Sequence, residues 1–292
     1  MELLRPEILE KIKALDLRAK IIVKGFLSGL HESPYHGFSL EFKEHRPYYK
    51  GDPINKIDWK LYGRTERFFL KKYEAETNLS AFLLVDKSNS MNFGEEISKF
   101  QYTRTLAASL AYLLLRQNDS VGLVLFSAKI ESFIPPRSQM NHLTHLLSSL
   151  SRNEPSGKTS LCDVIFELLS LVKKRALFII FSDLLETPSN VTKTINIMRA
   201  KKHEIIIFHI LDRKELEFPF RKEAIFRDME DLKTLSTDPK SINLMYKDRF
   251  KKFLEAYKSG FAPKKIDYSQ ITTDTPYDYA LVTYLKKRKR LL

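Results

Sequence analysis

Residues 81–91 read AFLLVDKSNSM, an apolar run that ends in a carboxylate followed by hydroxyls at alternate positions. Apolar runs without a helical period are typical of strands buried on both faces, as in a parallel sheet. This places Asp86 at the carboxyl end of a strand, the edge at which open α/β sheets bind ligands. Asp86, Ser88 and Ser90 would offer three oxygens to one point there. Oxygen ligands favour a hard divalent cation, Mg²⁺ or Mn²⁺.

The same three residues have a second interpretation, because Asp and Ser also cap helices and a helix is predicted to begin near Ser98. Two further segments favour the cation site. Residues 157–161 (GKTSL) precede a predicted helix, and residues 178–183 (FIIFSD) are a second apolar strand ending in Asp183. We therefore expect two strand-end carboxylates and the hydroxyl loop around Thr159 to converge at one edge of a sheet.

From residue 80 onward, apolar strands alternate with amphipathic helices, which is typical of a parallel sheet covered by helices on both faces. The pattern predicts strands over residues 81–85, 121–126, 129–134 (an edge strand), 178–183 and 205–211, and helices over residues 98–117, 139–151, 160–173, 189–201, 240–258 and 276–290. Ahead of them, residues 6–29 predict one or two amphipathic helices, because apolar side chains recur near helical spacing. These are Ile8, Ile12, Leu15, Ala19 and either Ile22 or Val23.

These positions resemble the von Willebrand factor A domain, whose metal-ion-dependent adhesion site combines an Asp-x-Ser-x-Ser loop, a distant Thr and a later strand-end Asp. The matching residues are Asp86, Ser88, Ser90, Thr159 and Asp183, in the family's order. The resemblance implies a Rossmann-like fold and an Mg²⁺ or Mn²⁺ ion held directly by the loop hydroxyls. The carboxylates and the Thr would act directly or through water. One metal position would stay open for an acidic oxygen of a protein partner.

A second set of motifs extends over nearly the whole chain. It couples Arg-x-Tyr, Gly-Asp and Ile-Asp-Trp, and the matching segments are residues 46–48, 51–52, 57–59, 63–65, 72–76, 217–220, 226–230 and 271–276. This combination resembles the bacterial family called domain of unknown function fifty-eight. That resemblance implies a MoxR-type AAA+ ATPase as partner, with the pair acting in chaperone-like assembly or maturation of other proteins or in stress responses.

Residues 41–60, the signature segment, allow two interpretations. In the structural one, aromatic side chains pin the segment onto the sheet and Arg46 pairs with a carboxylate. In the functional one, the segment forms a second interaction surface next to the metal edge. Its candidate residues are Arg46, Tyr48, Asp52, Asp58 and Trp59.

Composition indicates a soluble protein with a large core, since 43% of the 292 residues are hydrophobic. We expect residues 1–79 to form a helical lead and signature segment packed on a main domain, residues 80–292. No apolar run approaches the roughly 20 residues that span a bilayer, and the first residues do not resemble a signal peptide. The single Cys162 makes no intrachain disulfide, which suits a reducing compartment. We therefore expect a cytoplasmic protein.

The net charge of +13 is weighted toward the C-terminus, where a predicted helix ends in a basic cluster. The cluster consists of Lys286, Lys287, Arg288, Lys289 and Arg290. Because the helix dipole stabilises cations at a carboxyl end, ordinary electrostatics and solubility account for it. The alternative is contact with anionic lipid headgroups or nucleic acid.

The residues favour a protein-interaction module over an enzyme. An aspartyl-phosphate phosphatase needs a second carboxylate two residues after its nucleophile, and Ser88 stands there. The sequence also lacks a glycine-rich phosphate loop with Lys-Ser/Thr. We expect metal-dependent protein binding without a small-molecule substrate. Two alternatives stay open: a metal-dependent phosphoester hydrolase, and a basic peripheral module that binds anionic membranes or nucleic acid.

Overall fold

The computed structural model describes residues 10, 13–23, 45–47, 62–63, 68–71, 80–220, 224–231, 233–264 and 266–291. The chain divides into two compact units, residues 27–78 and residues 1–26 together with 79–292. In the smaller unit, β1 (His45–Pro47) and β2 (Phe69–Lys71) form an antiparallel pair. The packing of residues 1–79 on a main domain stays a prediction.

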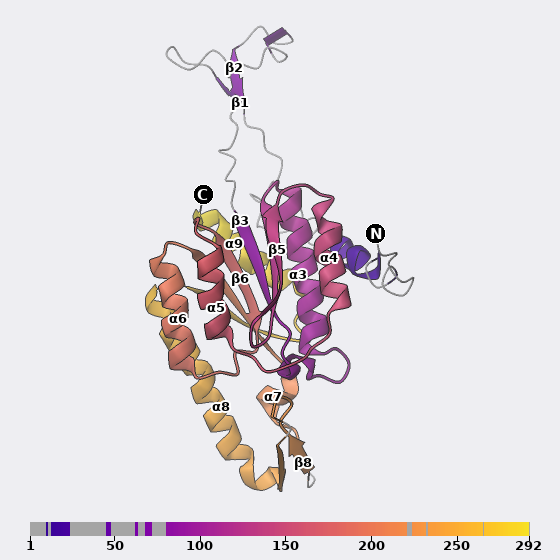
Figure 1. Cartoon of the computed structure of the whole chain (residues 1–292), viewed down its shortest axis with the longest axis vertical. Helices are drawn as coiled ribbons and strands as arrows, with labels where there is room; N and C mark the ends of the chain where they lie inside the picture. The colour runs from indigo at the N-terminus through magenta and orange to yellow at the C-terminus, as the bar shows by residue number, and fades with distance from the viewer. Residues whose placement is uncertain are drawn as a thin grey trace. The chain divides into compact units, whose positions relative to one another are not determined.

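The larger unit is built on a six-stranded sheet (Figure 1). Its strands are β3 (Ser80–Asp86), β4 (Ser120–Phe126), β5 (Ile130–Arg137), β6 (Leu177–Ser182), β7 (Glu204–Leu211) and β10 (Asp267–Thr272). Their order in the sheet is β10-β7-β6-β3-β4-β5, and every neighbouring pair is parallel except β4 and β5. The predicted Rossmann-like α/β fold is confirmed.

Helices connect the strands in the predicted alternation. They are α3 (Lys99–Arg116), α4 (His142–Arg152), α5 (Leu161–Leu171), α6 (Pro188–Ala200), α7 (Arg213–Glu217), α8 (Pro239–Phe261) and α9 (Tyr277–Leu291), with 3-10 turns η2 (Asn89–Asn92) and η3 (Ala262–Lys264). Helix α3 begins after Ser98, whose hydroxyl accepts a hydrogen bond from the Gln101 backbone N–H at 3.2 Å. The Gln101 side chain accepts one from the Ser98 N–H in return, so the two residues form a capping box.

The sheet is buried on both faces, which explains why its inner strands are unbroken apolar runs. Successive side chains of a strand point to opposite faces. Phe82 and Leu84 of β3 belong to the core cluster that includes side chains of α5, α6 and α8. Leu83 and Val85 lie on the other face, where α3 contacts β3 and β4. The sequence therefore places helices on both faces correctly.

Two elements of the sheet differ from the prediction. Strand β5 continues to Arg137, through Pro135 and Pro136, whereas the predicted strand ends at residue 134. Because β5 is the edge strand, a proline whose missing N–H would face outward costs no ladder hydrogen bond. Strand β10 was not predicted, because it reads DYSQIT and only Ile271 in it is buried. An edge strand of this kind lacks the apolar run of an inner strand.

The predicted N-terminal helix is confirmed over residues 13–23, where Leu15, Ala19 and Val23 are buried.

A further hairpin, β8 (Ala224–Arg227) and β9 (Thr234–Thr237), forms a separate two-stranded antiparallel sheet. In the described parts of the chain, no helix combines the length and the apolar character needed to cross a bilayer.

Leu84 is fully buried in the sheet core, so Leu84→Ala should leave a cavity and lower the free energy of unfolding by about 2–5 kcal/mol. Leu244→Ala is the matched control, because Leu244 on α8 is 84% exposed, and it should change stability by less than about 0.5 kcal/mol. Urea unfolding of both variants measures the difference. Equal losses would contradict this placement of the core.

Candidate functional site

The register of the parallel strands brings the two predicted carboxylates to one edge of the sheet. Strands β3 and β6 pair so that Asp86 lies beside Ser182, and Asp183 follows directly. Strand β7 pairs Ser182 with His209. All four side chains are fully buried. The strands alone therefore concentrate two acids and a histidine at one buried point.

The loop that carries Thr159 is held against the loop after β3 by backbone hydrogen bonds. The Asn89 N–H donates to the Gly157 carbonyl at 2.9 Å, and the Ser156 N–H donates to the Lys87 carbonyl at 2.7 Å. These bonds fix Thr159 next to the end of β3, although the two loops are distant in the sequence.

A network of hydroxyls surrounds Asp86. Its Oδ1 accepts a hydrogen bond from the Ser88 backbone N–H at 2.9 Å. Its Oδ2 accepts bonds from Ser182 Oγ at 2.6 Å and from Thr159 Oγ1 at 3.1 Å. The hydroxyl oxygens of Ser88 and Ser90 are 3.0 Å apart. Hydrogen bonds thus join four of the five predicted site residues, all but Asp183, into one network.

Asp183 is tied to a buried lysine that the sequence analysis did not single out. Lys99 Nζ donates to Asp183 Oδ2 at 2.8 Å and to Glu215 Oε1 at 2.6 Å, and the Lys99 side chain is fully buried. The other carboxylate oxygen, Asp183 Oδ1, is buried and has no hydrogen-bond partner among the described residues. One oxygen of the second acid is therefore free to accept a further ligand.

Burial dominates the electrostatics of this edge. It raises the pKa of Asp86 to about 7, and repulsion from Asp183 adds to the shift while hydrogen bonds from Ser182 and Ser88 oppose it. Burial alone would lower the pKa of Lys99, but its two carboxylate partners outweigh this and raise it. Burial lowers the pKa of His209 to about 4, so its ring is neutral near pH 7. The His209 Nε2–H donates to the Asp183 backbone carbonyl at 2.7 Å.

The two lysines next to predicted ligands point to other partners. Lys87 Nζ lies 2.6 Å from Glu131 Oε2 and donates to Ser156 Oγ at 2.9 Å. Lys158 forms an ion pair with Asp231. Neither ammonium group opposes a cation at the Asp86 edge.

Sequence reasoning missed a third acid near the site. Glu230, in the turn between β8 and β9, accepts a hydrogen bond from the Thr159 backbone N–H at 3.3 Å. Burial raises its pKa, with repulsion from Asp183 contributing. Glu230 ends the matched motif segment 226–230, but that motif assigned it no role at the site, and Thr159 is 71 residues away. Lys99 had one signal, since a lysine in the first turn of a helix opposes the helix dipole.

The donor set fits a hard divalent cation. Two buried carboxylates, a close hydroxyl pair and an acid oxygen without a partner are the chemistry that Mg²⁺ or Mn²⁺ prefers. Among the described residues, no group of three or more His, Cys, Asp or Glu side chains is arranged to hold a metal, so an ion here would depend on the Ser and Thr oxygens. Metal binding by Asp86, Ser88, Ser90, Thr159 and Asp183 stays a prediction.

Most of the residues predicted for the second interaction surface lie outside the part of the chain that the structure describes. Arg46 belongs to β1. Tyr48, Asp52, Asp58 and Trp59 fall outside the described residues. The basic cluster from Lys286 to Arg290 lies in the last turns of α9, where the structure describes the backbone alone.

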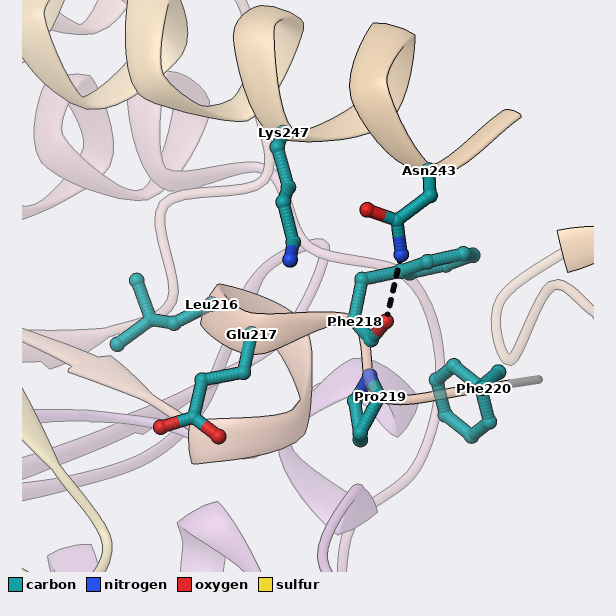
Figure 2. A pocket seen from close by; sticks show the side chains of 7 residues that line it. All are labelled: Leu216, Glu217, Phe218, Pro219, Phe220, Asn243 and Lys247. Atoms are coloured by element: carbon teal, nitrogen blue, oxygen red, sulfur yellow. Dashed lines mark hydrogen bonds between the residues drawn. The ribbon is translucent and has the colours of Figure 1, made fainter. Parts of the chain in front are cut away.

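A hollow of about 560 Å³ lies apart from the acidic edge, between α7 and α8 (Figure 2). Its lining residues are Leu216, Glu217, Phe218, Pro219, Phe220, Asn243 and Lys247. The Asn243 side chain, which extends from α8, donates to the Phe218 carbonyl at 2.9 Å. None of the predicted metal ligands lines this hollow.

Comparison with known proteins gives a family and a set of relatives. Residues 44–255 match the family model "Protein of unknown function DUF58". The uncharacterized protein Rv1480 of Mycobacterium tuberculosis is 25% identical over 240 residues, covering 80% of this chain and 75% of that protein. YeaD of Bacillus subtilis is 27% identical over 106 residues, covering 36% of this chain and 25% of that protein.

Among solved structures, the conserved hypothetical protein BatB from Bacteroides thetaiotaomicron is similar, with a TM-score of 0.49 and 15% identity over 73% of this chain and 99% of that one. The vWF domain of the type V pili tip protein Mfa5 from Porphyromonas gingivalis gives a TM-score of 0.34 and 9% identity, over 72% of this chain and 95% of that one.

Removing the Lys99 ammonium should leave the buried Asp183 carboxylate and the partly buried Glu215 carboxylate without their cation. We expect Lys99→Met to lower the free energy of unfolding by about 3–5 kcal/mol at pH 7, because Asp183 and Glu215 lose their shared cation. Lys251→Met is the control, since Lys251 is 76% exposed and its 3.9 Å pair with Glu255 should matter little. Chemical unfolding without divalent ions measures both, and an unchanged Lys99→Met stability would contradict the buried pair.

Proposed function

Because this chain belongs to the DUF58 family and its site residues resemble those of the von Willebrand factor A domain, we propose that it is a non-enzymatic protein-interaction module whose binding depends on a divalent cation. The observation that carries the proposal is the buried Asp183 Oδ1, which has no hydrogen-bond partner among the described residues and lies at the same sheet edge as Asp86 and the hydroxyls of Ser88, Ser90 and Thr159. A divalent cation would relieve the repulsion between Asp86 and Asp183.

In this proposal, Ser88, Ser90 and Thr159 contribute neutral oxygens to Mg²⁺ or Mn²⁺, and Asp86 and Asp183 contribute charge directly or through water. The bound ion supplies an electrophilic position for one carboxylate of a protein partner. Neutral hydroxyl ligands leave most of the positive charge of the ion available to that carboxylate, so partner affinity would follow metal occupancy.

The state of Asp86 supports binding over hydrolysis. Both of its oxygens are engaged, by the Ser88 N–H and by the hydroxyls of Ser182 and Thr159, and the side chain is fully buried. A nucleophile or general base has to reach a substrate atom within hydrogen-bond distance.

The partner that the family resemblance suggests is a MoxR-type AAA+ ATPase, with the pair acting in chaperone-like assembly, maturation or stress response. An acidic side chain on that ATPase, or on a client protein, would complete the metal site. The protein would act in the cytoplasm.

Metal binding is tested by thermal unfolding and by calorimetric titration with Mg²⁺ and Mn²⁺. The wild type should gain about 2.7 kcal/mol of stability when the free metal concentration is 100 times its dissociation constant. Asp86→Asn should lose this gain, measured against its own metal-free form, because the change removes one carboxylate charge from the site. Asp248→Asn, on the exposed side of α8, is the control. Equal metal affinity in Asp86→Asn would refute the site.

Partner binding is tested by capture of a purified MoxR-type ATPase on the wild type in Mg²⁺, on the wild type in EDTA, and on Asp86→Asn in Mg²⁺. We expect capture in the first arm alone. The variant arm is essential, since the ATPase itself uses Mg²⁺ with its nucleotide. Equal capture in all three arms would show that the ATPase binds at a surface other than the metal site. Capture in none of the arms would exclude this partner.

A further inference from the structure

The β8–β9 hairpin presents its acidic turn to the candidate metal site. Within the turn, Asp228 Oδ1 accepts hydrogen bonds from the backbone N–H groups of Glu230 at 2.8 Å and Asp231 at 2.7 Å. These two bonds fix the backbone on either side of the Glu230 side chain. The backbone position from which the Glu230 side chain extends is therefore set by the hairpin itself.

Two successive acids of this turn contact two successive residues of the loop before α5. Glu230 Oε1 accepts the Thr159 N–H at 3.3 Å, and Asp231 pairs with the Lys158 ammonium. Ser90 is close enough to Glu230 to lower the pKa of that carboxyl against the effect of burial. Glu230 thus contacts Thr159 of one loop that carries predicted hydroxyl ligands and lies near Ser90 of the other.

The charge around this contact is unbalanced. Burial, with repulsion from Asp183 added, raises the pKa of both Asp86 and Glu230, and the Lys99 ammonium is shared between Asp183 and Glu215. A carboxylate beside Ser90 and Thr159 is favourable when a cation binds to their hydroxyls. The proposed function would bring a carboxylate of the partner to the same hydroxyls.

We propose that Glu230 is a resident acidic ligand of the site, and that a protein partner binds by displacing the β8–β9 hairpin with a carboxylate of its own. This inference rests on the proposed function, because it assumes that the site holds a cation. In this inference the hairpin competes with the partner for the metal site, so an acidic partner has to bind the site more strongly than Glu230 does.

The hairpin is built so that displacement is feasible. Its two four-residue strands pair with each other and, within the described residues, with no strand of the central sheet. Isolated two-stranded hairpins are marginally stable in water. Besides its acidic contacts, it is held by Phe226, whose ring lies 5.5 Å from Phe218 and 5.4 Å from Phe220, two residues that line the hollow in Figure 2.

The test uses Mn²⁺ as the metal probe and acetate as the carboxylate probe, on the full chain. The variants are Glu230→Gln and, as a matched control, Glu255→Gln on the exposed face of α8. Mn²⁺ affinity is measured by titration, and acetate access by the ¹³C relaxation that protein-bound Mn²⁺ causes. Lys158→Met is a second variant, which weakens the hold on the hairpin and leaves Glu230 intact.

We expect Glu230→Gln to weaken Mn²⁺ binding about tenfold or more and to increase acetate relaxation at equal metal occupancy, while Glu255→Gln matches the wild type. Lys158→Met should also increase acetate relaxation. If Mn²⁺ affinity and acetate relaxation are unchanged in Glu230→Gln and Lys158→Met, the hairpin is not a competitor, although the metal site stands. If the wild type binds no Mn²⁺, the proposed function fails and this inference fails with it.

Discussion

Two buried carboxylates at the ends of adjacent parallel strands are the constraint on which the rest of this site depends. Asp86 and Asp183 are both fully buried and repel each other. Buried charge is costly unless it is paired or hydrogen-bonded. Around Asp86 the compensation comes from the Ser88 backbone and from the hydroxyls of Ser182 and Thr159. The backbone bonds that hold the Thr159 loop in place are therefore part of the electrostatic balance of the sheet edge.

The Lys99 ammonium joins elements that the sheet alone would not connect. Lys99 is the first residue of α3, and its ammonium group bridges Asp183, which follows β6, to Glu215 on α7. Helix α7 ends at Phe218, whose backbone is left-handed with φ of 44° and whose carbonyl accepts the Asn243 side chain. Helix α7 thus contacts the acidic edge through Glu215 and lines the hollow in Figure 2 with its last two residues, Leu216 and Glu217.

An acidic partner and the acidic turn of the hairpin would use the same chemistry at the same place. Specificity in such a site is a difference between affinities. A partner with an isolated acidic side chain would gain little over Glu230, whereas one that also contacts the surrounding surface would gain more. An internal carboxylate would in this way reject weak acidic ligands.

The sequence by itself determined the α/β alternation, the inner strands and the strand-end positions of Asp86 and Asp183, because unbroken apolar runs directly record burial on both faces of a sheet. It also identified the hydroxyls of Ser88, Ser90 and Thr159, which follow their strands or precede their helix closely. Only the tertiary structure decided that Lys99 is buried against Asp183, 84 residues away, and that Glu230 reaches Thr159. A lysine on a helix and an acid in a turn look solvent-exposed in a sequence, because their partners are set by long-range packing and cannot be read from the residues around them.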